Sequence, residues 1–233
     1  MNINNLNKKD WQWLYIHRCK EHNRRYAEHP ACFREDYPGV SKPSGIKEKI
    51  AFLDIETSNL MANFAVMLSW AIKPLKEKVV FDSITERDFA EHRKNHTLFN
   101  VDTRLVQSLV DEIQKYDRIV THYGRKFDIP FIRTRALIDK VAFPHFGILV
   151  NDDVYYWARY KLRLSSNRLE TVVNTLVGYS DKTHLDGKIW VPAGMGDMKC
   201  VAIVLEHNKI DVVEGEKEYL VLKDFVGIRN TSI

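Results

Sequence analysis

The chain has few cysteines and no long apolar run. Its 233 residues hold three cysteines, Cys19, Cys32 and Cys200, which cannot all pair with one another, and this low count suits a reducing compartment. No apolar stretch approaches the roughly 20 residues that a membrane-spanning helix needs. Residues 1–13 also lack the pattern of a secretory signal. We therefore expect an intracellular, cytoplasmic protein with no membrane partner.

Internal repeats and low-complexity tracts are also missing, and the hydrophobic content of 45% is that of a globular protein rather than a disordered one. The formal net charge is only +4, but it is unevenly spread. Residues 1–45 hold eight Lys or Arg against five Asp or Glu, a net of +3. A basic front end is compatible with a polyanionic partner, and a solvated surface is the simpler interpretation.

A stretch rich in Pro, Gly and Ser, residues 37–49, separates two differently patterned regions. We place a boundary near residue 45. Residues 1–45 then form a small, mainly helical extension, with a helix expected over residues 8–29, and residues 46–233 form the main domain.

The main domain alternates strand and helix patterns. Helical spacing predicts a helix after Asp102, a candidate N-cap, another with Pro130 in its first turn, and a third capped by Ser166 or Asn167. Strands are expected at 49–56, 64–72, 78–84, 117–124 and 146–153, and helices at 102–116, 127–140, 153–164 and 166–178. Residues 196–225 are expected to form one long helix or two helices in succession. This order predicts an α/β fold with a central mixed five-stranded sheet flanked by helices, whose first three strands form an antiparallel meander.

Two carboxylates end the first predicted strand, in the segment "IAFLDIETSNL". Asp54 and Glu56 are two residues apart, so they project from the same face of the strand. Like charges this close raise each other's cost of ionisation unless a positive charge lies between them. Oxygen ligands of this kind favour a hard divalent cation such as Mg²⁺ or Mn²⁺.

Further acidic residues stand at matching places along the chain. Asp128 begins a predicted helix directly after a strand and a glycine-containing turn. His207 and Asp211 are four residues apart on the last predicted helix and therefore lie on one face of it. A histidine beside an acid is a suitable pair for holding a cation and moving a proton from a bound water.

Three segments in this order, "LDIETSNL", "HYGRKFDIPFI" and "EHNKIDV", resemble the exonuclease motifs of the DEDD 3′ to 5′ exonucleases of the ribonuclease H-like superfamily. The likeness covers residues 48–228 and is greatest to the YprB-type domains and the exonuclease domains of B-family polymerases. It implies a ribonuclease H-like fold and phosphodiester hydrolysis by two Mg²⁺ or Mn²⁺ ions. The ions would be bound by Asp54, Glu56, Asp128 and Asp211.

Two positions depart from these motifs. Tyr123 stands where the second motif commonly has Asn, so a polar contact near the substrate is lost or is replaced by ring stacking. His207 has the spacing of the tyrosine branch but the residue type of the histidine branch. From its chemistry, we expect it to orient or deprotonate the attacking water, although a structural histidine is the alternative.

The sequence leaves several alternatives open. Each acid taken alone could be a helix cap or an exposed charge, and Asp211 could pair with Lys217. A nucleic-acid-binding module without turnover and a structure-specific endonuclease are the rival functions. The expected partners are single-stranded or duplex-end DNA or RNA, with a replication or repair protein as a further candidate. The choice between DNA and RNA is not encoded in motif spacing.

A second group of residues is suited to contact with nucleic acid. Aromatic and basic residues interleave after Asp152 and Asp153, and Tyr155, Tyr156 or Trp157 would be able to stack on a base, although aromatic clusters more often belong to a core. The candidate contacts are Tyr123, Arg159, Lys161, Arg163, Arg168 and Lys182.

The N-terminal extension carries a separate pattern. Cys19, His22, His29 and Cys32 are spaced as C-x2-H-x6-H-x2-C, two pairs of ligands that suit Zn²⁺. The pairs would point apart in one continuous helix. A basic amphipathic helix with partly buried Cys and His is the simpler interpretation, and a zinc site is the alternative.

Overall fold

A mixed five-stranded sheet organises the domain. The computed structural model describes residues 13–19, 22–28, 49–94, 100–145, 149–182 and 184–226. The strands lie in the order β3-β2-β1-β4-β5, with β1, β2 and β3 antiparallel, β4 parallel to β1, and β5 parallel to β4. They are β1 (Ile50–Thr57), β2 (Met67–Pro74), β3 (Val80–Ser83), β4 (Arg118–Thr121) and β5 (Val150–Asp153). The predicted mixed sheet and its antiparallel meander are confirmed.

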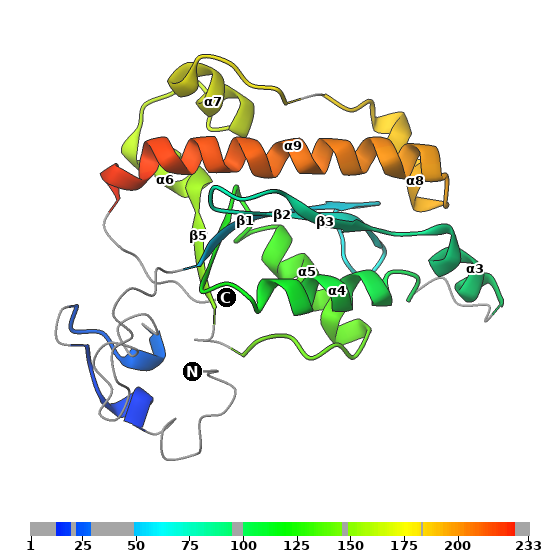
Figure 1. Cartoon of the computed structure of the whole chain (residues 1–233), viewed down its shortest axis with the longest axis horizontal. Coiled ribbons are helices and arrows are strands. Elements are labelled where there is room, and N and C mark those ends of the chain that lie inside the picture. The colour runs from blue at the N-terminus through cyan, green and yellow to red at the C-terminus, as the bar shows by residue number, and fades with distance from the viewer. Residues whose placement is uncertain are drawn as a thin grey trace.

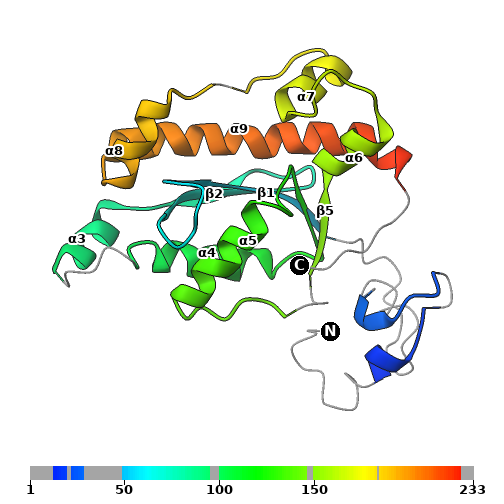
Figure 2. The ribbon, with the colours of Figure 1, turned by 180° about the vertical axis from the view of Figure 1, so that it is seen from behind.

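Helices cover both faces of the sheet, as Figures 1 and 2 show. α4 (Thr103–Ile113) and α5 (Asp128–Ile138) lie on one face. The opposite face carries α6 (Val154–Lys161), α7 (Leu169–Val177) and α9 (Met198–Leu222). The sequence did not predict α3 (Glu86–Lys94) or α8 (Trp190–Gly194). Short 3-10 turns are η2 (Tyr26–Glu28), η3 (Gly187–Ile189) and η4 (Lys223–Phe225). Among the described residues, no helix is apolar enough over sufficient length to span a bilayer.

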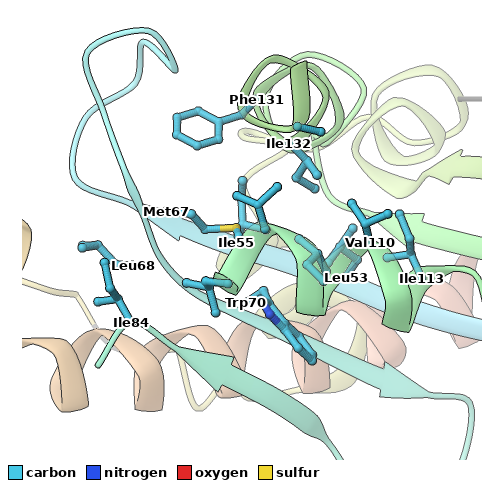
Figure 3. Packing of buried hydrophobic residues seen from close by; sticks show 14 of the residues in the cluster. Leu53, Ile55, Met67, Leu68, Trp70, Ile84, Val110, Ile113, Phe131 and Ile132 are labelled. Atoms are coloured by element: carbon cyan, nitrogen blue, oxygen red, sulfur yellow. The ribbon is translucent and has the colours of Figure 1, made fainter. Parts of the chain in front are cut away.

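Two hydrophobic clusters follow from this layering. The larger lies mainly between the sheet and the α4 and α5 helices, with Leu53 and Ile55 of β1 facing Ile113 and Ile132 (Figure 3). It also extends to Val201 and Val204 near the start of α9. The smaller lies beneath α6, α7 and α9 and contains Phe52. Burial of these side chains supplies most of the favourable free energy of folding.

The alternation along β1 divides its side chains between the two faces. Leu53 and Ile55 belong to the larger cluster, whereas Phe52 packs under α9, where its ring lies 5.4 Å from that of Tyr219. Continuing the period of two from Phe52 places Asp54 and Glu56 on the α9 face as well. The apolar pattern of one strand thus fixes the side on which its two acids emerge.

Three sequence-based expectations about local structure are wrong. Asp102 occupies the N-cap position of α4, but its side chain caps no helix and instead contacts other elements. α7 begins at Leu169 with Arg168 as its N-cap, so neither Ser166 nor Asn167 caps it. Where a helix is expected over residues 8–29, the described part has an α-helix only at residues 13–16 and a 3-10 turn at Tyr26–Glu28.

The Asp102 carboxylate instead forms a buried ion pair with Arg135 of α5. It also accepts a hydrogen bond of 2.7 Å from the backbone N–H of Met67. Arg135 Nη1 donates to the backbone oxygen of Ala62 at 3.3 Å. These contacts join α5 to the loop before α4 and to the start of β2. A buried charge of this kind is tolerated only with its partner in place.

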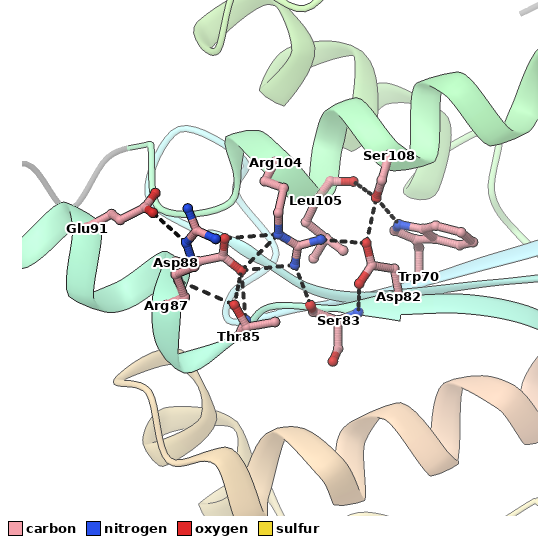
Figure 4. A network of polar contacts seen from close by, with 10 residues as sticks. All are labelled: Trp70, Asp82, Ser83, Thr85, Arg87, Asp88, Glu91, Arg104, Leu105 and Ser108. Atoms are coloured by element: carbon pink, nitrogen blue, oxygen red, sulfur yellow. Dashed lines mark hydrogen bonds and ion pairs between the residues drawn. The ribbon is translucent and has the colours of Figure 1, made fainter.

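A second polar network lies nearer the surface (Figure 4). The Arg104 guanidinium of α4 binds the carboxylates of Asp82 and Asp88, at 2.6 Å and 2.9 Å. Ser108 Oγ donates to Asp82 at 2.8 Å and accepts from the indole of Trp70 at 3.0 Å. The network joins α3 and β3 to α4 at the outer edge of the sheet.

We predict that Asp102→Ala lowers the free energy of unfolding by about 3 kcal/mol, because it removes the closer of the two carboxylates that pair with the buried Arg135 guanidinium, the other being Asp139 at 3.4 Å. Chemical denaturation at pH 8 is the measurement, since the Asp102 pKa is raised to about 6 by burial against the opposing effect of Arg135. Arg87→Ala, which removes an exposed i,i+4 pair with Glu91, serves as the control with no measurable change expected. Equal stability of the two variants would contradict this role of the buried pair.

Candidate metal centre

α9 brings three polar side chains over the end of β1. This helix runs uninterrupted from Met198 to Leu222, and the Asp197 carboxylate caps it by accepting from the backbone N–H of Lys199 at 2.9 Å. His207, Asn208 and Asp211 are all buried, which places them on the face that packs against β1 and β2. The single helix confirms that His207 and Asp211 share one face.

Asn208 ties the helix to the first acid. Its Nδ2 donates a hydrogen bond of 2.6 Å to Asp54 Oδ2, and its Oδ1 accepts one of 3.2 Å from Ser69 Oγ of β2. Asn208 is fully buried. An amide held at both ends can orient the Asp54 carboxylate, which leaves the other carboxylate oxygen available to a ligand.

Glu56, His207 and Asp211 form a compact group. His207 Nε2 lies 3.8 Å from Glu56 Oε1 and 3.8 Å from Asp211 Oδ2. One potential ligand atom from each residue lies within 4.8 Å of the others. This spacing suits a single cation, and two carboxylates with an imidazole are a donor set that divalent metals accept.

Asp128 approaches from the other side of β1. It is the first residue of α5, with Phe127 at the N-cap, so it is not the cap of that helix. Its Oδ1 accepts a hydrogen bond of 3.1 Å from the backbone N–H of Ile55, the residue between the two acids of β1. Asp128 is therefore held against the strand that carries Asp54 and Glu56.

The turn from β4 into α5 depends on local backbone geometry. A Cβ at Gly124 would lie 2.4 Å from the Thr121 Cβ, so only glycine allows the close approach of these two segments. Tyr123 has a φ of 66°, a left-handed conformation that is costly for a residue with a side chain. The Asp153 carboxylate stabilises the turn by accepting from the backbone N–H groups of Tyr123 and Arg125, at 2.9 Å and 3.0 Å.

Burial and mutual repulsion keep the acids from ionising easily. Burial, followed by the charges of Asp128, Asp211 and Glu56, raises the pKa of Asp54 well above its ordinary value. Burial and the Asp211 charge likewise raise the pKa of Glu56, and burial raises the pKa of Asp128 to about 7. The Oδ1 atom of Asp211 is buried with no hydrogen-bond partner among the described residues. Buried carboxylate oxygens of this kind are suitable ligands for the divalent cation that the sequence predicts.

Lys182 places a positive charge among these carboxylates. It lies between α7 and η3, and its ammonium group pairs with Asp211 Oδ2. Burial lowers its pKa, but the carboxylates of Asp211, Asp54 and Glu56 outweigh that effect and leave the pKa raised. Lys182 thus lies in the acidic site itself, and Lys217, the partner considered for Asp211, pairs instead with Glu214 and Asp181.

Burial lowers the pKa of His207, and the neighbouring Asp211 charge only partly offsets it. A lowered pKa leaves the imidazole neutral at physiological pH, in the form that accepts a proton. Its position between Glu56 and Asp211 suits the role of a base that the sequence suggested.

Some neighbours of the site were not singled out from the sequence. Asn208 is one: a polar residue three positions before Asp211 on the same helix face was the available signal. His122 and Glu218 are another pair, joined by a 2.7 Å contact from His122 Nδ1 to Glu218 Oε2. No spacing rule links β4 to the end of α9, so this pair was visible only in the fold.

The predicted aromatic contacts divide into two groups. Trp157 is part of the core beneath α9, with its ring 5.6 Å from that of Tyr219. Tyr123, Tyr156 and Tyr160 instead form a row on the surface. Successive ring centroids in the row lie 6.3 Å and 6.0 Å apart, with interplanar angles of 29° and 18°.

A pocket of about 470 Å³ lies beside this row and is lined by Tyr156, Tyr160 and three cations, Arg125, Lys126 and Lys161. Asp153 also lines it and lies close enough to Asp128 to raise that carboxyl's pKa. The pocket therefore adjoins the acidic site.

The remaining predicted residues lie elsewhere. Arg159 Nη1 donates to the Tyr155 hydroxyl at 3.3 Å, next to the row of rings. Arg163 and Arg168 are exposed between α6 and α7 and do not line the pocket. Of the N-terminal Cys and His residues, Cys19 and His22 are described, whereas His29 and Cys32 lie outside the described residues.

Comparison with known proteins identifies the family. Residues 51–219 match the RNase_H superfamily, so the chain belongs to that superfamily, and the matched range contains Asp54, Glu56, Asp128 and Asp211. No curated protein matches the chain.

The fold is also similar to that of a solved structure, the family B DNA polymerase from the hyperthermophilic archaeon Pyrobaculum calidifontis. The TM-score is 0.56 at 15% sequence identity, over 81% of this chain and 26% of the polymerase chain. The superfamily match supports a nuclease-type function, and the similarity to the polymerase is one of fold.

The raised pKa of Asp128 predicts a pH-dependent stability in the absence of metal. Its folded pKa of about 7 exceeds the ordinary 3.8, so the folded state binds a proton that the unfolded state releases. The free energy of unfolding therefore falls as pH rises through this range. Asp128→Asn cannot ionise, so its melting temperature should exceed that of the wild type by more at pH 8 than at pH 5, with EDTA present.

Thermal melts of both proteins at the two pH values test this directly, because contributions from shared groups such as His207 largely cancel in the comparison. Mg²⁺ added at pH 8 should narrow the difference by stabilising the wild type. A difference that stays constant between pH 5 and pH 8 would rule out an ionising Asp128 in a repulsive site.

Proposed function

We propose that this protein is a metal-dependent nuclease, a 3′ to 5′ exonuclease that hydrolyses phosphodiester bonds with two Mg²⁺ or Mn²⁺ ions. The observation that carries the proposal is the convergence of Asp54, Glu56, Asp128 and Asp211 around one buried site. Four carboxylates packed together without a cation would repel one another and destabilise the fold. The motif resemblance supports the exonuclease direction.

The divalent ions, held by Asp54, Glu56, Asp128 and Asp211, would lower the pKa of a bound water and offset charge on the scissile phosphate. Asn208 orients the Asp54 carboxylate through its 2.6 Å hydrogen bond. Neutral His207, 3.8 Å from Glu56 and from Asp211, takes the proton of the attacking water. This scheme uses His207 in the neutral form that its surroundings favour.

In this scheme, Lys182 has two successive partners, first Asp211 and then a phosphate of the substrate. It neutralises Asp211 in the protein alone, where the pair is a short contact beneath α9. If ions bound that carboxylate, the Lys182 ammonium would become available to bind a phosphate oxygen of the substrate. Lys182 would then be a phosphate contact only in the metal-bound protein.

We predict that Asp54→Asn lowers kcat by about a thousandfold or more, since metal ions contribute several kcal/mol to such reactions. The assay is cleavage of a 5′-labelled single strand with Mg²⁺ or Mn²⁺, for DNA and RNA oligomers of the same sequence. A ladder shortening from the 3′ end is expected for the wild type. Asp111→Asn, an exposed carboxylate of α4, is the matched control with unchanged activity.

Three other outcomes of this assay would each contradict part of the proposal. Cleavage by Asp54→Asn at the wild-type rate would show that the acidic site takes no part in catalysis. Binding of the oligomer without cleavage would favour a nucleic-acid-binding module that has lost turnover. Cleavage of a circular single strand would favour an endonuclease.

The row of tyrosines is proposed to hold the strand next to the scissile bond. Tyr123 and Tyr160 are 45% and 70% exposed, so their rings can stack on bases, while Arg125, Lys126 and Lys161 of the adjoining pocket can contact phosphates. Stacking on an aromatic ring is tolerant of base identity. This suits an enzyme that removes nucleotides successively from strands of any sequence.

We predict that Tyr160→Ala raises the KM for a single-stranded oligomer by about tenfold, the loss of one base stack, with kcat unchanged. Hydrolysis of the p-nitrophenyl ester of thymidine monophosphate should stay at the wild-type rate, because that substrate is too short to reach the row. Tyr179→Ala, a ring exposed to a similar degree beside Lys217, is the control. An equal loss on the short ester would show that Tyr160 acts through the fold and not through the strand.

A further inference from the structure

The described part of the N-terminal extension contains a hairpin, which carries a cysteine and a histidine between its two bridged residues. Arg18 and Arg25 form an isolated antiparallel bridge, and Cys19 N–H donates to the Arg24 oxygen at 2.7 Å. Asn23 N–H donates back to the Cys19 oxygen at 2.9 Å, with Asn23 in a left-handed conformation at φ 51°. The hairpin therefore replaces the continuous helix in which Cys19 and His22 would have pointed away from any second pair.

The two side chains of this turn point at each other. Cys19 Sγ lies 3.5 Å from His22 Nδ1. In a tetrahedral zinc site, bonds of about 2.3 Å to sulfur and about 2.0 Å to nitrogen place these two atoms about 3.5 Å apart. The separation in the hairpin is the one that a shared zinc ion requires.

The backbone adds a donor to the same sulfur atom. His22 N–H lies 3.4 Å from Cys19 Sγ and donates to it. The Cys19 sulfur is therefore held between a backbone N–H group and an imidazole nitrogen, in a residue that is only 1% exposed.

Among the described residues, the hydrophobic cluster of the hairpin is small. Its buried members are Leu14, Cys19, Tyr26 and Ala27, with Trp13 packed against them. Trp13 stacks between the rings of His17 and Tyr26, at 4.2 Å and 5.0 Å. Elements of this size generally depend on a disulfide or a structural metal, and the low cysteine count of the chain disfavours a disulfide.

We propose that Cys19 and His22 are ligands of a structural zinc ion that folds the N-terminal hairpin. Structural zinc takes four protein ligands. The C-x2-H-x6-H-x2-C spacing predicts His29 and Cys32 as the second pair, on the sequence pattern alone. The site is separate from the acidic site, uses softer ligands, and does not depend on the proposed nuclease function.

The first measurement is metal analysis of the full-length protein, purified without chelator and dialysed against Mg²⁺. About one zinc per chain is expected in the wild type, with most of it lost in Cys19→Ser and in Cys32→Ser. Cys200→Ser is the matched control, because Cys200 lies on α9 outside this region and should leave the zinc content unchanged.

Cobalt distinguishes this site from the acidic one. Co²⁺ bound by a cysteine gives a thiolate-to-metal charge-transfer absorption, which carboxylates cannot produce. We expect this band in the wild type and in Cys200→Ser, and its loss in Cys19→Ser. His22→Cys keeps a competent ligand set and should bind cobalt with a stronger band from its additional thiolate. This rescue separates ligation from packing, since a side chain needed only for packing would gain nothing from becoming cysteine.

The proposal is overturned if the wild type holds no zinc and develops no cobalt band, which would leave a simple S–H···N hydrogen bond between Cys19 and His22. Zinc retained at the wild-type level in Cys19→Ser would overturn it as well. Full retention in Cys32→Ser would overturn the four-ligand pattern. None of these results bears on nuclease activity, so the two proposals fail independently.

Discussion

The repulsion among buried carboxylates beneath α9 is the interaction on which the site depends. Asp54 and Glu56 leave the end of β1 on the face that α9 covers, and Asp211 meets them from the helix. Burial and neighbouring charge both raise the pKa values of Asp54 and Glu56, and the Lys182 ammonium offsets the repulsion only in part. The divalent cations proposed above would complete this neutralisation. The stability of the domain and the chemistry of its site are therefore coupled by the same charges.

The core and the site share a single geometric cause. β1 alternates between the cluster under α4 and α5 and the cluster under α9, and the same period of two that buries Phe52 presents the acids to His207. Asp128 is held to this strand through the Ile55 N–H. A shift of one residue in the register of β1 would move the acids into the apolar cluster under α4 and α5, and Leu53 and Ile55 to the polar site beneath α9. Hydrophobic packing thus enforces the arrangement of charge.

Much of this was predictable from the sequence where it depended on periodicity. The five strands, the helix that carries Asp211 and the pairing of His207 with Asp211 follow from apolar spacing and from the positions of acids at strand and helix ends. Contacts between segments that are far apart in the sequence were not predictable. Asp102 stands where a cap is expected but pairs with Arg135, and Lys182 turns into the acidic site from a polar loop. In both cases a long-range charge partner overrides the local signal. The N-terminal hairpin was missed because its apolar positions also fit a helix.

The most direct test of the central claim is Mn²⁺ binding, followed by electron paramagnetic resonance of the free ion at pH 7.5. The wild type should bind Mn²⁺, and the double variant Asp54→Asn with Asp211→Asn should lose that binding while keeping its fold by circular dichroism. Mn²⁺ binding that is unchanged in a folded double variant would contradict the account.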